Sequence, residues 1–373
     1  MTTRGQPQES EAFLVLEDGS VHRGYAFGAA RVDAIGEVVF NTSMVGYQEM
    51  LTDPSYGGQI LVPTYPLQGN YGINDRDVES SRVQVRGFVV REVCDLPSNR
   101  LSTRTLDEYL RDEGVPGVYG VDTRALTRRL RTAGVMMGII VTGGGPEEAL
   151  EQLRRAPDYG SLDLVSEVAA AVPYEWAEGP GGLPPDAPRI VVMDEGLKYN
   201  ILRLLRRRGC AVTVVPSATP LDDIVALRPA GVLLSPGPGD PALLDTVVRT
   251  AQGLLGRLPV MGICLGHQVV ARALGGRTYK LKFGHRGGNH PVKDLATDRV
   301  TITAQNHGYA VDGDGLPPGL DVSHLNLNDN TVEGLTHREL PLLTIQYHSE
   351  ASPGPLDNEY LFDRFLDLIR ENR

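Results

Sequence analysis

The second half of the chain alternates short apolar runs with segments in which apolar residues recur at helical spacing. Short runs are typical of buried strands, whereas recurrence every three or four residues is typical of helices that cover a sheet. The strands are expected at residues 190–193, 212–215, 231–234, 260–263 and 342–346. The helices between them are expected at residues 201–205, 221–227, 243–255 and 265–274. This alternation predicts a doubly wound, mainly parallel α/β domain that binds ligands at the carboxyl ends of its strands.

The first part of the chain has more strand-like runs and fewer helical patterns. Strands are expected at residues 13–16, 38–40, 60–62 and 135–141 and within 83–93. Helices are expected at residues 106–111 and 123–131, and the Gly-, Pro-, Tyr- and Asn-rich residues 41–71 are expected to form ordered loop. We therefore expect a β-rich α+β domain. By itself it would be interpreted as a structural or interaction module.

A change of composition separates the two parts. Residues 178–188 are so rich in Pro and Gly that they cannot sustain a helix or a central strand, which is typical of an exposed linker. The sequence thus predicts an N-terminal domain at residues 1–155, a linker at 156–188 and the α/β domain at 189–373.

Composition narrows the classes of function. At 373 residues the chain is long enough for two cores, and its net charge of -11 argues against general nucleic-acid binding. No apolar run reaches the length of a transmembrane helix, and the N-terminus lacks an apolar signal-peptide core. The three cysteines have neither disulfide nor zinc spacing, so we expect a cytoplasmic protein without a bound metal.

Cys264 lies at the predicted junction between a strand and the helix that follows. Gly262 and Gly266 flank it in the Gly-x-Cys-x-Gly pattern of a nucleophile elbow, in which small neighbours permit a tight turn. A helix N-terminus favours the thiolate, and the N–H of Leu265 can donate to an oxyanion. An isolated cysteine is more often a small buried residue. The flanking glycines make a nucleophile an equally good interpretation.

A base and an orienting acid follow the last predicted strand. His348 and Glu350 are two residues apart, so their side chains point to one side of an extended chain. Because carboxyl ends of parallel strands share one edge of a sheet, we expect this pair beside Cys264. A thiol nucleophile needs a base, and the base needs an orienting group. Alone, His348 would be interpreted as a surface histidine, but the three residues together favour a catalytic triad.

Three motifs at this edge are similar to those of the class I, triad-type glutamine amidotransferases. They are Ser-Pro-Gly-Pro-Gly at residues 235–239, Gly-Ile-Cys-Leu-Gly-His-Gln at 262–268 and Tyr-His-Ser-Glu at 347–350. Nearly the whole chain also resembles one family among them, the small, glutamine-hydrolysing subunits of carbamoyl-phosphate synthetase. The additional motifs lie at residues 40–56, 120–124, 198–203, 282–293, 306–309 and 351–355.

The resemblance implies a role for each matching residue. Cys264 would attack the side-chain amide of glutamine, His348 would shuttle the proton, and Glu350 would orient His348. The N–H groups of Gly237 and Leu265 would form the oxyanion hole. Glutamine would be bound by Ser55, Gly237, Gly239, Leu265, Gln268, Asn306, Gly308 and Tyr309. Because Ser55 lies in the predicted first domain, that domain should close over the site.

The resemblance also implies a partner. Released ammonia would pass to a large synthetase subunit, which would use ATP and bicarbonate to make carbamoyl phosphate for pyrimidine or arginine biosynthesis. This chain would need no cofactor of its own and would act in a heteromer, without nucleic acid or membrane. Three alternatives stay open: the glutaminase component of anthranilate or GMP synthesis, a stand-alone thiol hydrolase of the same fold, and a binding module without activity. The first domain argues against the first of these, and the intact triad against the last.

Overall fold

The computed structural model describes residues 10–30, 32–179 and 181–372. Contacts divide the chain into two compact units, of which the first comprises residues 1–41, 58–77 and 85–159. The second comprises residues 42–57, 78–84 and 160–373. Residues 42–57 and 78–84, expected in the N-terminal domain, therefore group with the second unit. Within the described ranges, no helix is long and apolar enough to cross a membrane.

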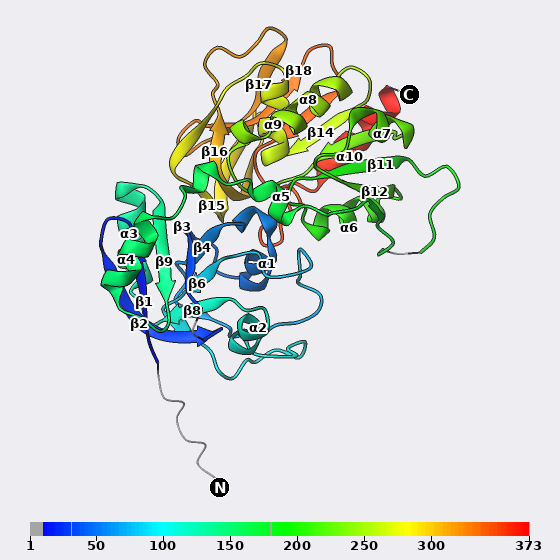
Figure 1. Cartoon of the computed structure of the whole chain (residues 1–373). Helices are drawn as coiled ribbons and strands as arrows, with labels where there is room; N and C mark the ends of the chain where they lie inside the picture. The colour runs from blue at the N-terminus through cyan, green and yellow to red at the C-terminus, as the bar shows by residue number, and fades with distance from the viewer. Residues whose placement is uncertain (1–9, 31, 180, 373) are drawn as a thin grey trace. The chain divides into compact units, whose positions relative to one another are not determined.

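The first unit is a closed β-barrel with strand order β1-β2-β8-β6-β4-β3-β9. Its strands are β1 (Glu11–Leu16), β2 (Val21–Gly28), β3 (Ala34–Asn41), β4 (Gln59–Pro63), β6 (Gly87–Val89), β8 (Pro116–Tyr119) and β9 (Met136–Val141). Apolar side chains such as Leu14, Val38 and Ile140 are fully buried. Helices α2 (Leu106–Asp112), α3 (Thr123–Ala133) and α4 (Pro146–Arg154) pack against strands β2, β3 and β9 respectively (Figure 1). The strands β5 (Leu67–Gln68) and β7 (Glu92–Val93) form a separate pair. This unit is the expected β-rich α+β domain.

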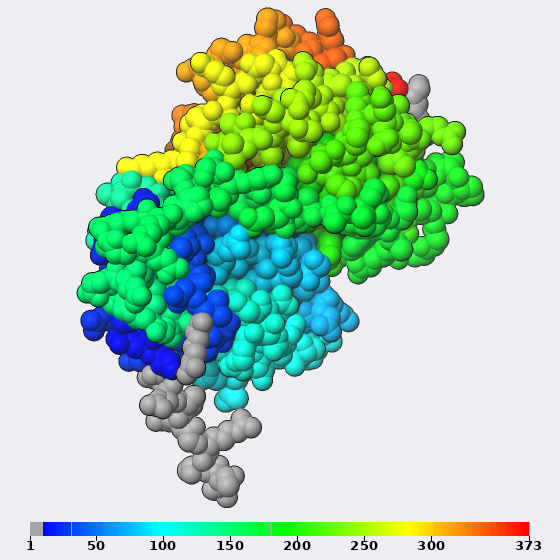
Figure 2. Space-filling view, in the orientation of Figure 1, coloured from blue at the N-terminus to red at the C-terminus, as the bar shows by residue number. Residues whose placement is uncertain are grey.

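The second unit is built on one mixed sheet of order β10-β12-β11-β13-β14-β19-β18-β17-β15-β16. Strands β12 (Ala211–Pro216), β11 (Arg189–Asp194), β13 (Gly231–Leu234), β14 (Val260–Ile263) and β19 (Leu342–Ile345) are parallel neighbours. The remaining strands pair antiparallel: β10 (Tyr174–Glu175), β15 (Thr278–Asp294), β16 (Val300–Val311), β17 (Leu320–Asn326) and β18 (Val332–His337). In the space-filling view the yellow and orange side chains of this antiparallel part lie next to the green ones of the parallel part (Figure 2). The doubly wound, mainly parallel prediction holds for the five strands that carry the expected site.

Two apolar layers cover the two faces of the parallel strands. In β11, Ile190 and Val192 belong to one buried cluster, whereas Val191 and Met193 belong to the other, as alternating strand residues should. Helices α6 (Tyr199–Arg207) and α10 (Tyr360–Glu371) supply the first cluster. Helices α7 (Leu221–Ala226), α8 (Asp245–Leu254) and α9 (Leu265–Ala273) supply the second (Figure 1). The layers fix the orientation of every strand whose carboxyl end reaches the site.

The expectation of loop throughout residues 41–71 was wrong in part. Helix α1 (Tyr47–Thr52) and the 3-10 turn η1 (Pro54–Tyr56) form there. Gly46 precedes α1 at φ 92°, a left-handed conformation that favours glycine, and Asp53 caps η1 by accepting a hydrogen bond from Ser55 N. The Gly and Pro residues thus delimit short helices. The expected linker likewise contains the 3-10 turn η2 (Tyr159–Ser161), helix α5 (Leu164–Val168) and strand β10.

Candidate active site

Cys264 occupies a strained turn between β14 and α9. Its φ of 54° and ψ of -105° lie outside the regions that L residues ordinarily adopt, which costs about 1–3 kcal/mol where the surrounding structure enforces it. The neighbours must be glycines. A Cβ on Gly266 would lie 2.3 Å from the Leu234 carbonyl oxygen, and one on Gly262 would lie 2.8 Å from the Gly266 backbone. The sequence pattern therefore has a direct steric cause.

The pairing of β14 with β19 brings the second triad candidate to the same sheet edge. Ile263 lies opposite Ile345 in a parallel register, and Cys264 N donates a hydrogen bond of 2.8 Å to Ile345 O. The chain continues from β19 to His348, whose N donates to Ala304 O over 2.9 Å. Cys264 and His348 are thus held by backbone hydrogen bonds at neighbouring strand ends.

His348 and Glu350 form a short, buried pair. The His348 Nδ1 to Glu350 Oε1 distance is 2.6 Å, and the residues are 3% and 0% exposed. Burial alone would lower the pKa of His348, but the charges of Glu350 and Cys264 outweigh it and raise that pKa to about 10. The imidazole is therefore held as an imidazolium, with Nδ1 donating to the carboxylate.

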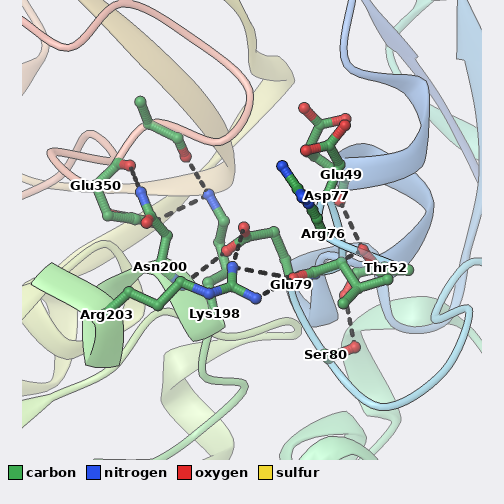
Figure 3. Close-up of polar contacts among 12 residues, drawn as sticks. Glu49, Thr52, Arg76, Asp77, Glu79, Ser80, Lys198, Asn200, Arg203 and Glu350 are labelled. Atoms are coloured by element: carbon green, nitrogen blue, oxygen red, sulfur yellow. Dashed lines mark hydrogen bonds and ion pairs between the residues drawn. The ribbon is translucent and has the colours of Figure 1, made fainter. Parts of the chain in front are cut away.

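A buried lysine that the sequence analysis assigned no role completes the electrostatics. Lys198 Nζ lies 3.1 Å from Glu350 Oε1 and also donates to the Ala351 carbonyl oxygen (Figure 3). Burial would raise the pKa of Glu350, but Lys198 and His348 lower it to about 2. Glu350 therefore stays ionised between two cations. Lys198 was visible in the sequence only as part of a motif, because nothing local shows that its ammonium is buried.

The Pro/Gly loop after β13 lies against the start of α9. Ser235 O accepts from Gly266 N over 3.0 Å, while Ser235 N donates to Glu195 Oε2 over 2.7 Å. A Cβ on Gly237 would lie 2.1 Å from Glu195 O, so only glycine fits this close approach. Leu265 begins α9, where the first N–H groups have no acceptor within the helix. Glu195 braces this loop, and sequence reasoning gave it no role.

The residues expected to bind glutamine are connected through Asp53. Its Oδ1 accepts from Ser55 N and its Oδ2 from Asn306 Nδ2, each over 2.9 Å. The Cys264 thiol lies 3.7 Å from the Asn306 carbonyl oxygen. The structure therefore brings Ser55, Asn306 and Cys264 together within the second unit. Asp53 is a further residue that sequence reasoning missed.

The other expected ligands of glutamine lie on α9, on β16 and in the Pro/Gly loop after β13. Gln268 Nε2 donates to Tyr309 O over 2.8 Å and to Gln346 Oε1 over 3.0 Å. Gly308 and Tyr309 lie on β16, two and three residues after Asn306. Gly239, at φ 88°, lies at the far end of its loop beside Leu164.

Several buried oxygens in this region lack a partner in the described part of the chain, among them Ser55 Oγ, Glu195 Oε1, Ser349 Oγ and Glu350 Oε2. Buried polar atoms are almost always hydrogen-bonded, so an orphaned hydroxyl next to Asp53 and Asn306 is a position at which a ligand's polar group would be satisfied. This observation supports Ser55 as a ligand-binding residue.

A histidine cluster elsewhere on the sheet has the composition of a metal site. Ligand atoms of His285, His307 and Glu333 lie within 4.8 Å of one another. However, His285 Nε2 lies 2.8 Å from Asp329 Oδ2, and its Nδ1 lies 3.6 Å from Glu333 Oε1. Burial would lower the pKa of His285, but these two carboxylates raise it to about 9. A protonated His285 between two carboxylates therefore explains why these residues lie so close together.

Comparison with known proteins matches both parts of the chain to known families. Residues 14–140 match the family of the carbamoyl-phosphate synthase small chain, CPSase domain, and residues 191–368 match glutamine amidotransferase class-I. The carbamoyl phosphate synthase small chain of Syntrophotalea carbinolica is 54% identical over 372 residues, covering 97% of this chain and 99% of that one. That of Akkermansia muciniphila is 51% identical over 366 residues, covering 97% and 98%. A solved glutamine amidotransferase from Thermotoga maritima overlaps 50% of this chain and 85% of its own, with a TM-score of 0.36 and 17% identity.

Proposed function

Because the chain belongs to the family of carbamoyl phosphate synthase small chains, we propose that Cys264, His348 and Glu350 are the residues with which it hydrolyses glutamine. The chain is a glutamine-hydrolysing synthase subunit with a class I amidotransferase domain. The observation that carries the residue assignment is the 2.6 Å pair of His348 and Glu350 at the same sheet edge as the strained Cys264 turn. A structural cysteine would not require a costly backbone conformation.

The first half of the reaction forms a thioester. The Cys264 thiolate attacks the carbon of the glutamine side-chain amide, and the electron pair of the C=O bond moves to its oxygen. The N–H groups of Gly237 and Leu265 stabilise this oxyanion. His348 Nε2 then gives its proton to the amide nitrogen, the C–N bond breaks, and ammonia leaves.

The second half releases glutamate. His348, now neutral, takes a proton from water, and the hydroxide oxygen attacks the thioester carbon. The C–S bond breaks, which regenerates the thiolate of Cys264 and the imidazolium of His348. Glu350 keeps Nδ1 protonated throughout, so that Nε2 is the nitrogen that exchanges the proton.

The charges of the site change in the direction that these reaction steps require. In the resting site Cys264 is among the groups that raise the pKa of His348. Once the thiolate has been consumed in the covalent bond, this contribution ends and the pKa of His348 falls. The imidazolium is therefore a stronger acid at the moment when the leaving nitrogen needs a proton.

Membership of this family implies a large-subunit partner. We propose that ammonia passes to this subunit, which uses ATP and bicarbonate to make carbamoyl phosphate for pyrimidine or arginine biosynthesis. Ammonia that escapes into water is protonated and ceases to be a nucleophile. We therefore expect a low glutaminase rate for the isolated chain and a marked rise on adding the large subunit with its substrates. Equal rates with and without that subunit would contradict the coupling.

Substitution of the nucleophile tests the residue assignment. Cys264→Ser should abolish glutamate release, because the serine hydroxyl is far less acidic than a thiol, while ammonia-dependent synthesis by the complex should survive. Cys94→Ser is the matched control, since Cys94 is a free, partly exposed cysteine of the first unit. A thiol-reactive glutamine analogue should label the wild type and the control but not Cys264→Ser. Retained glutaminase activity in Cys264→Ser would overturn the assignment.

A further inference from the structure

A buried glutamate that lies outside the reacting groups is bonded to two separate parts of the site. Glu79 belongs to the short segment 78–84, which groups with the second unit, and its side chain is 2% exposed. No motif in the sequence singled it out. Its hydrogen bonds reach helix α6 on one side and helix α1 on the other (Figure 3).

On the first side, Glu79 caps helix α6. The residue before this helix, Lys198, makes no side-chain cap hydrogen bond among the described residues. Glu79 supplies the missing acceptors from far away in the sequence: its carbonyl oxygen accepts from Tyr199 N over 2.9 Å, and its Oε2 accepts from Asn200 N over 3.0 Å. A carboxylate there also complements the positive end of the helix dipole. Glu79 thus fixes where and in which direction α6 starts.

The residues at that helix start are the ones that hold the triad acid. Lys198 Nζ is 3.1 Å from Glu350 Oε1. Asn200 Nδ2 donates to the Glu350 carbonyl oxygen over 2.5 Å. Both the carboxylate and the backbone of Glu350 are therefore positioned by the turn of chain that Glu79 caps.

On the second side, Glu79 holds the loop that presents Ser55. Glu79 N donates to Thr52 Oγ1 over 2.9 Å. Thr52 is the last residue of α1, and Asp53 follows it and binds both Ser55 N and Asn306 Nδ2. One residue thus connects the support of the triad acid with the support of the expected glutamine ligand.

We infer that Glu79 is a positioning residue for glutamine hydrolysis. It fixes the chain that supports Glu350 relative to the loop that carries Ser55. The inference rests on the proposed roles of Cys264, His348 and Glu350. Glu79 itself makes no described hydrogen bond to any of these three residues. Its effect on the reaction therefore passes through Lys198, Asn200 and Thr52.

The charge of Glu79 provides a signature that a purely structural residue would lack. The charged groups facing it are Lys198, which precedes α6, Arg203 of α6, whose Nη1 lies 3.3 Å from Oε1, and Glu350 after β19. Burial raises the pKa of Glu79 and outweighs the two cations and the Asn200 N–H, so that the pKa is about 7. The carboxylate is therefore formed as the pH rises through about 7, within the range in which the reaction can be measured.

The test compares Glu79→Ala and Glu79→Gln in the complex with the large subunit, with glutamate release as the assay. Glu79→Ala removes the carboxylate that accepts from Asn200 N and pairs with Arg203, but it keeps the backbone hydrogen bonds to Tyr199 N and Thr52 Oγ1. It should lower kcat by about tenfold to a hundredfold, since small misplacements of reacting groups cost rates of that order. Glu79→Gln keeps an oxygen for Asn200 N but carries no charge, so its kcat at pH 8 should lie between that of Glu79→Ala and that of the wild type. Its pH profile should lack the ionisation near 7 that the wild type shows.

Asp294→Asn is the matched control. Asp294 is also a buried acid that accepts from a backbone N–H, Ala296 N over 2.8 Å, and lies 3.6 Å from an arginine, Arg364. Its loss should lower the melting temperature but leave kcat, KM and the pH profile of the folded enzyme unchanged.

Three results would overturn the inference. The first is wild-type kcat and KM in folded Glu79→Ala. The second is a loss of activity in Glu79→Ala that thermal melting attributes entirely to unfolded protein. The third is an unchanged pH profile in Glu79→Gln. If Glu79→Ala does not fold, this third result is sufficient by itself to test the inference. Cys264→Ser, measured in parallel, separates the two proposals, because its retained activity would contradict the triad assignment whatever the Glu79 variants do.

Discussion

Ser55→Ala should weaken glutamine binding without weakening the fold. Ser55 is 5% exposed, and its Oγ lacks a hydrogen-bond partner in the described part of the chain. Its backbone is held independently, because Ser55 N donates to Asp53 Oδ1. Removal of the hydroxyl therefore breaks no hydrogen bond of the unliganded protein. Since an orphaned buried hydroxyl is unfavourable, we expect the free energy of unfolding to change by less than about 1 kcal/mol, or to rise.

The loss appears only when glutamine is bound. A hydrogen bond to a charged ligand group is worth roughly 1.5–3 kcal/mol. This corresponds to an increase of about tenfold to a hundredfold in KM for glutamine. Because Ser55 is not expected to contact the amide carbon that reacts, kcat should change much less than KM. Initial rates of glutamate release over a wide range of glutamine concentrations, with the large subunit present, give both constants.

Thr219→Val is the control with the opposite pattern. Thr219 Oγ1 donates to Pro216 O over 2.7 Å in the turn between β12 and α7. The isosteric valine should cost about 1 kcal/mol of stability and leave KM unchanged. The reasoning about Ser55 would be refuted if Ser55→Ala kept the wild-type KM, or if it lost stability as Thr219→Val does. Either result would mean that the hydroxyl is satisfied inside the protein.

Four further substitutions test the electrostatics. His348→Asn should lower turnover by about 10²-fold or more with little loss of fold, whereas Glu350→Gln should be milder; a larger effect of Glu350→Gln would contradict the assigned roles. Lys198→Met leaves the carboxylate of Glu350 with one cation fewer in a buried site and should cost about 3–5 kcal/mol of stability by denaturant titration; an unchanged midpoint would refute the ion pair. The raised pKa of His285 stabilises the fold below pH 6.5, and this contribution is lost as the pH rises through about 9. His285→Gln should therefore lose about 3 kcal/mol at pH 6 and little above pH 9; a loss independent of pH would show that His285 is not protonated.

The parts of this protein that the sequence determined are those with a local physical cause. The Cys264 turn requires glycine on both sides, so the turn can be recognised from the five residues 262–266. His348 and Glu350 are two residues apart, so the sequence places them close together, although they lie in the turn after β19 and not in the extended chain that was expected. The alternation of apolar runs and helical spacing likewise determined the parallel strands and the edge at which these residues meet.

Tertiary structure alone decided which charged residues are buried and what they face. Lys198 is charged and directly precedes a helix, as surface residues often do, yet its Nζ is buried against Glu350. Two of the supporting hydrogen bonds join residues that are far apart in the sequence. Glu79 and Asn200 are 121 positions apart, and Asp53 and Asn306 are 253 positions apart. Periodicity reports only whether a segment has an apolar face. The free energy of burying a charge depends on partners that the chain brings together only by folding, so these supports of the site have no local pattern to reveal them.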